Sequence, residues 1–202
     1  MVRKYAPWIL VAVAALILTG MAAWMLAGPP ARQTSTATGT PAIGGAFNLV
    51  DQDGKPVDQS ILKGKWTAVF FGYTFCPDVC PTTLQTLGAA SSQLGPRGKD
   101  FQVVFVTVDP ERDKPAVLKS YLSSAAFPRG TIGLSGTSDQ IAAIAKAYGV
   151  FYQKEGSGSG YAVDHSSAIY LMNPKGQFDS VIAYGLTPEQ TRDQIVKAMR
   201  QG

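Results

Sequence analysis

Apolar residues form one long run at the start of the chain. No residue between Tyr5 and Ala31 is charged, and the run is almost wholly apolar. About 20 such residues, at a rise of ~1.5 Å each, span a bilayer core of ~30 Å. This length predicts an uncleaved transmembrane helix within residues 1–28. A cleaved signal peptide is the alternative, although its apolar region usually has only about 7–15 residues.

Two basic residues, Arg3 and Lys4, precede this run. The positive-inside rule keeps such residues in the cytoplasm, so the remainder of the chain is predicted on the other side of the membrane. The segment lacks the Arg- and Ser-rich character of an organelle transit peptide. We therefore expect a single-pass protein of the bacterial cytoplasmic (inner) membrane, with its domain on the periplasmic or extracytoplasmic side.

A short polar stretch separates the predicted anchor from the rest of the chain. Residues 29–43 are mostly small, polar or proline residues without periodicity, a composition typical of a flexible tether. The remaining residues, 44–202, are numerous enough to bury a substantial core. They are predicted to form one domain.

The apolar pattern of this domain alternates between strands and helices. Residues 66–72 and 101–108 are apolar runs typical of buried strands, and each precedes a helical pattern, over 82–94 and 114–126. An Asp-Gly turn predicts a small hairpin over 47–57. Residues 131–134 predict another short strand and residues 138–148 another helix.

The last part of the domain has a different order. Strands are predicted at 150–152 and 168–172, on either side of a Gly- and Ser-rich loop at 156–160. The second of them is expected to pair with 178–184 through a turn at 173–176, and a helix follows from Thr187 to about Arg200. Parallel units followed by an antiparallel hairpin and a helix predict an α/β domain of three α/β/α layers with a mixed sheet.

The net charge of +4 is placed mostly at the N-terminus. Arg3, Lys4 and Arg32 precede the domain, whereas no acidic residue occurs before Asp51. Without those three, basic and acidic residues are nearly balanced. The domain therefore lacks the basic surface expected of a nucleic-acid-binding protein, and nucleic acid is excluded as a partner.

The two cysteines of the chain, Cys76 and Cys80, lie where a predicted strand passes into a predicted helix. Sites in α/β domains commonly form at this edge of the sheet, and the positive end of a helix lowers the pKa of a nearby thiol. A plain stabilising disulfide is the alternative. It would close so short a loop that its contribution should fall at the low end of ~0–5 kcal/mol.

The single histidine, His165, offers an imidazole that can join the two sulfurs. Two thiolates are too few for a closed structural zinc site, whereas two thiolates and one imidazole suit copper. The alternative is a partly buried histidine satisfied by Asp164 or by the backbone. Asp164 and Asp78 are the candidates for outer-shell partners, Asp78 with a turn-capping role as its main alternative.

Three motifs occur in order: Thr-Phe-Cys-Pro-Asp-Val-Cys-Pro at 74–81, Val-Asp-Pro-Glu-Arg-Asp at 108–113 and Val-Asp-His-Ser-Ser at 163–167. Together they closely resemble the Sco (SenC) family of copper chaperones for cytochrome c oxidase assembly. The resemblance covers residues 44–201. It implies a thioredoxin-like fold with an inserted hairpin and the binding of Cu(I) or Cu(II) by Cys76, Cys80 and His165.

The resemblance also implies a function. The chain is expected to be a copper metallochaperone for the binuclear copper centre, acting on cytochrome c oxidase subunit II or on another copper-centre assembly protein. The alternative is a membrane-anchored thiol:disulfide oxidoreductase in which Cys76 and Cys80 are the catalytic redox pair and reduce the cysteines of that centre. A peroxiredoxin-like peroxidase ranks third. Asp109 and Arg112 are expected to stabilise a loop beside the site, and Met172 to lie in the core.

Overall fold

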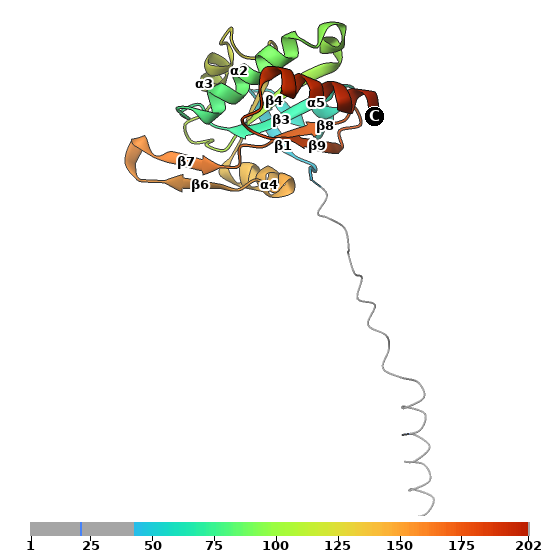
Figure 1. Cartoon of the computed structure of the whole chain (residues 1–202). Coiled ribbons are helices and arrows are strands. Elements are labelled where there is room, and N and C mark those ends of the chain that lie inside the picture. The colour runs from blue at the N-terminus through green and yellow to red at the C-terminus, as the bar shows by residue number, and fades with distance from the viewer. Residues whose placement is uncertain (1–20, 22–42, 202) are drawn as a thin grey trace, which may run out of the picture. The chain divides into compact units, whose positions relative to one another are not determined.

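The computed structural model describes Met21 and residues 43–201 (Figure 1). Apart from Met21, these residues belong to the second of two compact units, Pro41–Gly202. The predicted anchor and tether therefore lie outside the described residues, except for Met21 and Ile43. Among the described helices, none has the length and apolar character needed to cross a bilayer.

Within residues 43–201, seven strands form one mixed sheet in the order β2-β1-β5-β4-β3-β8-β9. The central strands β3, β4 and β5 are parallel, and the other neighbours pair antiparallel. This confirms the predicted mixed sheet and the hairpin of its first two strands. The strands are β1 (Asn48–Asp51), β2 (Pro56–Asp58), β3 (Trp66–Gly72), β4 (Phe101–Thr107), β5 (Ile132–Ser135), β8 (Ile169–Met172) and β9 (Phe178–Ile182).

Helices cover both faces of this sheet. Figure 1 shows α2, α3 and α5 on one face and α4 on the other, which confirms the three predicted layers. The helices are α2 (Val79–Ser92), α3 (Pro115–Leu122), α4 (Ser138–Tyr148) and α5 (Pro188–Gln201), with short 3-10 turns η2 (Gln59–Leu62), η3 (Gly95–Asp100) and η4 (Gly158–Gly160).

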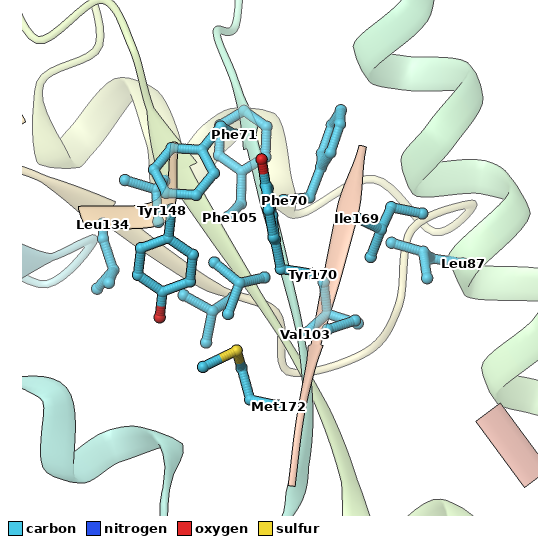
Figure 2. Packing of buried hydrophobic residues seen from close by; sticks show 14 of the residues in the cluster. Phe70, Phe71, Leu87, Val103, Phe105, Leu134, Tyr148, Ile169, Tyr170 and Met172 are labelled. Carbon is cyan, nitrogen blue, oxygen red and sulfur yellow. The ribbon is translucent and has the colours of Figure 1, made fainter. Parts of the chain in front are cut away.

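Strand β3 lies at the centre of the core and is buried at every position. Because successive side chains of a strand point to opposite faces, its neighbouring phenylalanines serve different layers. Phe70 packs against Phe105 with ring centroids 6.0 Å apart, and Phe71 against Tyr148 of α4 at 5.3 Å (Figure 2). Met172 is 1% exposed and belongs to this core, as predicted.

Helix α2 begins at Val79, three residues before its predicted start. The prediction rested on the apolar spacing of later residues and missed the first turn. The Thr82 N–H donates to the Asp78 carbonyl at 3.1 Å, and Pro81 is tolerated there because the first turn leaves its N–H groups without intrahelical partners. Cys80 therefore lies inside the first turn of the helix.

Helix α3 ends at Leu122, so the predicted extension to 126 was wrong. The Ser123 hydroxyl donates to the Ser120 carbonyl at 2.7 Å and satisfies one of the carbonyls left over at the helix end. A serine at this position thus supports termination, which apolar spacing alone does not reveal.

The predicted strand at 150–152 was displaced, and its partner was missed. Helix α4 ends at Tyr148, the capping residue Gly149 adopts the left-handed conformation, and the Val150 N–H then donates to the Ala145 carbonyl at 2.8 Å. These residues complete the helix end, so the strand begins later. β6 (Tyr152–Glu155) pairs with β7 (Ala162–His165), which the apolar pattern did not predict, as a two-stranded sheet of its own within the described residues. It lies between α4 and β8 in the chain and confirms the inserted hairpin that the family resemblance implied. In Figure 1 this hairpin projects from the main sheet.

Candidate metal centre

The cysteine loop connects the end of β3 at Gly72 to the start of α2 at Val79. Cys76 lies within the loop and is half-buried, whereas Cys80 is fully buried. The backbone N–H of Cys80 donates to the Cys76 sulfur at 3.4 Å, so the first turn of the helix directs a donor at that sulfur. Both cysteines are free thiols. Access from solvent is therefore on the Cys76 side.

His165 is the last residue of β7 and reaches the cysteines from the hairpin. Its Nε2 lies 3.3 Å from the Cys80 sulfur. The imidazole is edge-on to the ring of Tyr73, with centroids 5.8 Å apart and an interplanar angle of 89°. Its Nδ1 lies 2.9 Å from the Ser166 carbonyl oxygen, which can only accept a hydrogen bond. Nδ1 therefore carries the proton, and in the neutral ring Nε2 presents a lone pair towards the sulfurs.

The structure brings the three sequence-predicted ligands together. The sulfurs of Cys76 and Cys80 and a ring nitrogen of His165 all lie within 4.8 Å of one another. Two soft sulfur donors and one imidazole suit Cu(I) and Cu(II) better than they suit hard cations, which prefer oxygen ligands. The donor set therefore fits the predicted metal.

The two thiols differ in acidity because one stabilises the other. The Cys80 thiol donates a hydrogen bond to the Cys76 sulfur, and this bond lowers the pKa of Cys76 to about 5 against the effect of burial. The backbone N–H groups of Cys80 and Asp78 and the His165 side chain contribute in the same direction. The same bond, together with burial, raises the pKa of Cys80. One sulfur is thus a ready nucleophile and metal ligand at neutral pH, whereas the other keeps its proton until a metal or a disulfide replaces it.

Gly72 makes room for the Cys80 sulfur at the end of β3. A Cβ at this position would lie 2.7 Å from that sulfur and 2.9 Å from a ring carbon of Phe105. Real Cβ atoms essentially never approach so closely. The sequence contained the signal, a glycine at the end of an apolar strand, but the signal does not by itself say which side chain fills the space.

The two candidate outer-shell carboxylates have other surroundings. The described contacts of the Asp78 carboxylate include the Thr82 hydroxyl, which donates to it at 3.3 Å, and it is the Asp78 backbone that contacts the Cys76 sulfur. Asp164 is exposed and lies opposite Gln153 in the hairpin. The atom that orients the imidazole is the Ser166 carbonyl. Sequence reasoning missed it because a backbone carbonyl has no side-chain signature.

The loop after β4 is hydrogen-bonded to the cysteine loop. Asp113 is fully buried and accepts hydrogen bonds from the Thr74 N–H at 2.9 Å, the Thr74 hydroxyl at 2.6 Å and the Thr107 hydroxyl at 2.7 Å. Asp109, also fully buried, forms an ion pair with Arg112. This agrees with the predicted stabilising role of Asp109 and Arg112, whereas the contribution of Asp113 was missed.

Comparison with known proteins gives a consistent family match. A family model described as SCO1/SenC matches residues 35–200. The curated protein SCO1 homolog 1, mitochondrial, of Arabidopsis thaliana is 40% identical over 167 residues, which cover 82% of this chain and 49% of the relative. Other curated relatives are mitochondrial proteins of yeast and mammals or come from Rickettsia. The chain spans about half the length of the first curated relatives that it matches.

Solved structures give the same picture. The crystal structure of Arabidopsis thaliana ScoI with copper bound is 40% identical, with a TM-score of 0.75, and the match covers 80% of this chain and 100% of that one. The structure of Bradyrhizobium japonicum ScoI with copper bound is 42% identical, with a TM-score of 0.71 and coverage of 78% and 99%. These similarities confirm the thioredoxin-like α/β fold.

Proposed function

Because the chain belongs to the SCO1/SenC family, we propose that it is a copper chaperone that supports assembly of the binuclear copper centre of cytochrome c oxidase. The observation that carries the proposal is the convergence of two sulfurs and one ring nitrogen within 4.8 Å. Copper is the cargo of this site. Relatives whose structures were solved with copper bound, at about 40% identity, support the assignment.

Cargo binding and release follow from the chemistry of the three side chains. Reduced Cys76 and Cys80 bind copper as thiolates, and the Nε2 atom of His165 completes the set. Half-burial of Cys76 leaves one side of the site open to ligands of a partner. Oxidation of the two thiols to a disulfide removes both sulfur ligands, so redox state controls whether the site can hold copper.

The partner and location are proposed with the function. The recipient is cytochrome c oxidase subunit II or another copper-centre assembly protein. The apolar segment of residues 1–28 anchors the chain in the bacterial inner membrane, and the polar tether at 29–43 lets the domain reach a recipient outside the cytoplasm. Relatives from Rickettsia support a bacterial source for the chain, whereas the Arabidopsis and yeast relatives are mitochondrial.

The test uses the full chain in detergent, reduced and free of metal. We expect it to bind one copper with thiolate-to-copper charge-transfer absorption and to pass the metal to an apo copper domain of subunit II. His165→Ala keeps both thiols but should bind copper at least about tenfold more weakly, since even an outer-shell loss costs about that much. Equal affinity in this variant would remove His165 from the site, and unchanged absorption in Cys76→Ser would remove that sulfur.

A second function is favoured by the unequal thiols. A half-buried thiolate beside a buried thiol is the arrangement of an attacking cysteine and a resolving cysteine. Cys76 would attack a partner disulfide and form a mixed disulfide, with one partner sulfur leaving as a thiolate. Cys80 would then attack Cys76, which forms their disulfide and releases the partner as a dithiol. Two electrons thus pass from this chain to the partner.

The two functions differ in their need for His165. Reduction of an oxidised subunit II peptide in a single turnover should yield one peptide dithiol per Cys76–Cys80 disulfide. If His165→Ala reduces the peptide at the wild-type rate but fails to transfer copper, both activities exist and the imidazole serves only copper. If neither protein reduces the peptide, the oxidoreductase proposal fails.

A further inference from the structure

A charged cluster attaches the hairpin that carries His165 to the loop that follows β4. Four residues before His165, the side chain of Tyr161 turns towards the loop that follows β4, and its hydroxyl donates to Asp109 at 2.7 Å. Asp109 is fully buried, and its own N–H donates to the Thr107 hydroxyl at the end of β4. The hairpin is thus joined to a fixed point of the central sheet.

Arg112 lies at the centre of this cluster. Its Nε donates to the Asp109 carboxylate, and its Nη1 donates to the Tyr161 carbonyl at 2.9 Å. The guanidinium carbon lies 3.7 Å from the centroid of the Tyr161 ring and 4.7 Å from that of Phe75. Tyr161 belongs to the hairpin, whereas Phe75 directly precedes Cys76. One planar cation therefore contacts both parts that supply metal ligands.

The contacts of Arg112 are of a kind that arginine makes well. Its planar group stacks on aromatic faces while its N–H donors point outwards in the plane, and its side chain is only 15% exposed. Partial exclusion of water strengthens both the ion pair with Asp109 and the ring contacts. A lysine ammonium could replace the charge but not the planar stack.

A second ion pair joins the same hairpin to the same loop, but it lies in solvent. Lys154 pairs with Glu111 at 2.7 Å, and the side chains are 45% and 61% exposed. Exposed pairs of this kind contribute little to stability. Lys154 also lies over the Tyr161 ring, with its Nζ 4.8 Å from the ring centroid. The pair still serves as a control, because it links the same two segments, has no described contact with the cysteine loop, and can be broken at Glu111 with Lys154 and Arg112 both retained.

We propose that Arg112 is a positioning residue that holds the His165 hairpin against the cysteine loop, so that the imidazole stays within reach of the two sulfurs. The inference rests on the proposed function for the use made of that geometry. β7 connects Tyr161 to His165 directly, so a shift at Tyr161 is transmitted along one strand. Tyr73 assists from the cysteine side, since its hydroxyl hydrogen-bonds to the backbone of Val163 and its ring lies against the imidazole.

The test compares full-length Arg112→Lys with wild type and with Glu111→Gln, all in detergent. Arg112→Lys keeps a cation beside the buried Asp109, which protects the fold. Tyr161→Leu is the second variant, because it removes the ring and leaves the Asp109–Arg112 pair in place. The metal-free readouts are amide hydrogen exchange in β7 and the NMR signals of His165, which are unique because the chain has one histidine.

We expect faster exchange in β7 and broadened His165 signals in Arg112→Lys and Tyr161→Leu, with α2 unchanged and Glu111→Gln like wild type. With Cu(II) bound, the nitrogen hyperfine coupling of the imidazole should weaken, and copper affinity should fall by about tenfold, as for other outer-shell losses. Thiolate charge transfer should persist. Loss of sulfur and nitrogen signatures together would instead indicate general disruption and overturn the proposal.

Further outcomes would overturn the proposed role of Arg112 or the proposed function. Unchanged β7 exchange and nitrogen coupling in both variants would overturn the role of Arg112, and so would a Glu111→Gln protein that behaves like Arg112→Lys. If the wild-type chain binds no copper, the proposed function fails. The exchange comparison would still test the hairpin attachment, with faster β7 exchange supporting it and equal exchange refuting it.

Discussion

The sulfur of Cys80 and Nε2 of His165 lie 3.3 Å apart although 85 residues separate them in the chain. One belongs to the first turn of α2 and the other to the end of an inserted hairpin. The sulfur is fixed by burial behind β3, whereas the imidazole depends on how the hairpin docks. The metal centre is therefore a junction between a rigid part of the fold and an appended one.

The first prediction concerns the state of the imidazole. Because the Ser166 carbonyl can only accept, we expect the neutral ring of metal-free His165 to carry its proton on Nδ1 and to leave Nε2 bare. Nitrogen-15 NMR of histidine-labelled protein in alkaline buffer distinguishes the two tautomers. A ring protonated on Nε2 would contradict the orientation described above, since that nitrogen would then need deprotonation before it could bind a metal.

The second prediction is that the two thiols react at very different rates. With the pKa of Cys76 lowered to about 5, its thiolate fraction is complete well below neutral pH, so alkylation by iodoacetamide should already be at its plateau near pH 7. Cys80, with a raised pKa and no exposure, should remain unlabelled. Mass spectrometry of the separated peptides measures both rates.

A matched variant tests the cause of this difference. Cys80→Ala removes the thiol that donates to Cys76 and keeps the backbone N–H at 3.4 Å. The pH profile of Cys76 alkylation should therefore move towards the ordinary value of 9.0 without reaching it. A profile identical to that of wild type would mean that the backbone N–H groups, the helix terminus and the His165 side chain stabilise the thiolate without the Cys80 thiol.

The sequence predicted most of the central sheet because buried strands leave continuous apolar runs. β3 and β4 were predicted to within one residue of their bounds, and the spacing of apolar residues predicted α4 at its observed bounds. Element ends were less accurate, since a first turn containing Pro81 and a last turn closed by Ser123 depend on backbone hydrogen bonds. β7 was missed because an exposed two-stranded hairpin buries little and has a weak apolar pattern.

The ligand residues could be predicted because they are scarce and chemically suited to one another. The groups that position these ligands could not be predicted from the sequence. The carbonyl of Ser166, the carboxylate of Asp113 and the space at Gly72 act through positions in three dimensions that no local pattern encodes. Arg112 is an intermediate case. The sequence predicted that it stabilises a loop beside the site, but only the folded structure shows its contact with the hairpin at Tyr161.

The third prediction concerns Gly72. Gly72→Ala places a methyl group 2.7 Å from the Cys80 sulfur, so the sulfur or the strand must move. Overpacking of this kind typically costs about 1–3 kcal/mol, which denaturant unfolding of the full chain would measure. A displaced sulfur should also weaken copper binding. Gly160→Ala is the control, because its methyl would meet no atom within 4 Å, and we expect a change within about 0.5 kcal/mol.

The fourth prediction concerns the buried carboxylate beneath the cysteine loop. Asp113→Ala leaves two donors of Thr74 and one of Thr107 without their acceptor. Each buried group left unpaired costs about 1–3 kcal/mol, so unfolding should be easier by at least about 2 kcal/mol and the cysteine loop should become more accessible to thiol reagents. An unfolding free energy like that of wild type would mean that water replaces the carboxylate.

The same carboxylate makes a signed prediction about pH. Burial raises the pKa of Asp113 above its ordinary value of 3.8, against hydrogen bonds that lower it. Between 3.8 and the raised value the folded chain holds a proton that the unfolded chain has lost, so this group's contribution to stability is present below pH 3.8 and declines as pH rises. Asp113→Asn has no carboxyl group to titrate. Its unfolding free energy should be lower than that of wild type at low pH, and the difference should narrow as pH rises because only wild type loses stability through this group. Asp53 provides a contrast of opposite sign below pH 3.8, since its hydrogen bond from Lys119 lowers its pKa, and the unfolding free energy of Asp53→Asn should fall relative to wild type as pH rises from that lowered value to 3.8. Unfolding curves on both sides of pH 3.8 would reject the buried-carboxylate account if the difference between Asp113→Asn and wild type widened with rising pH.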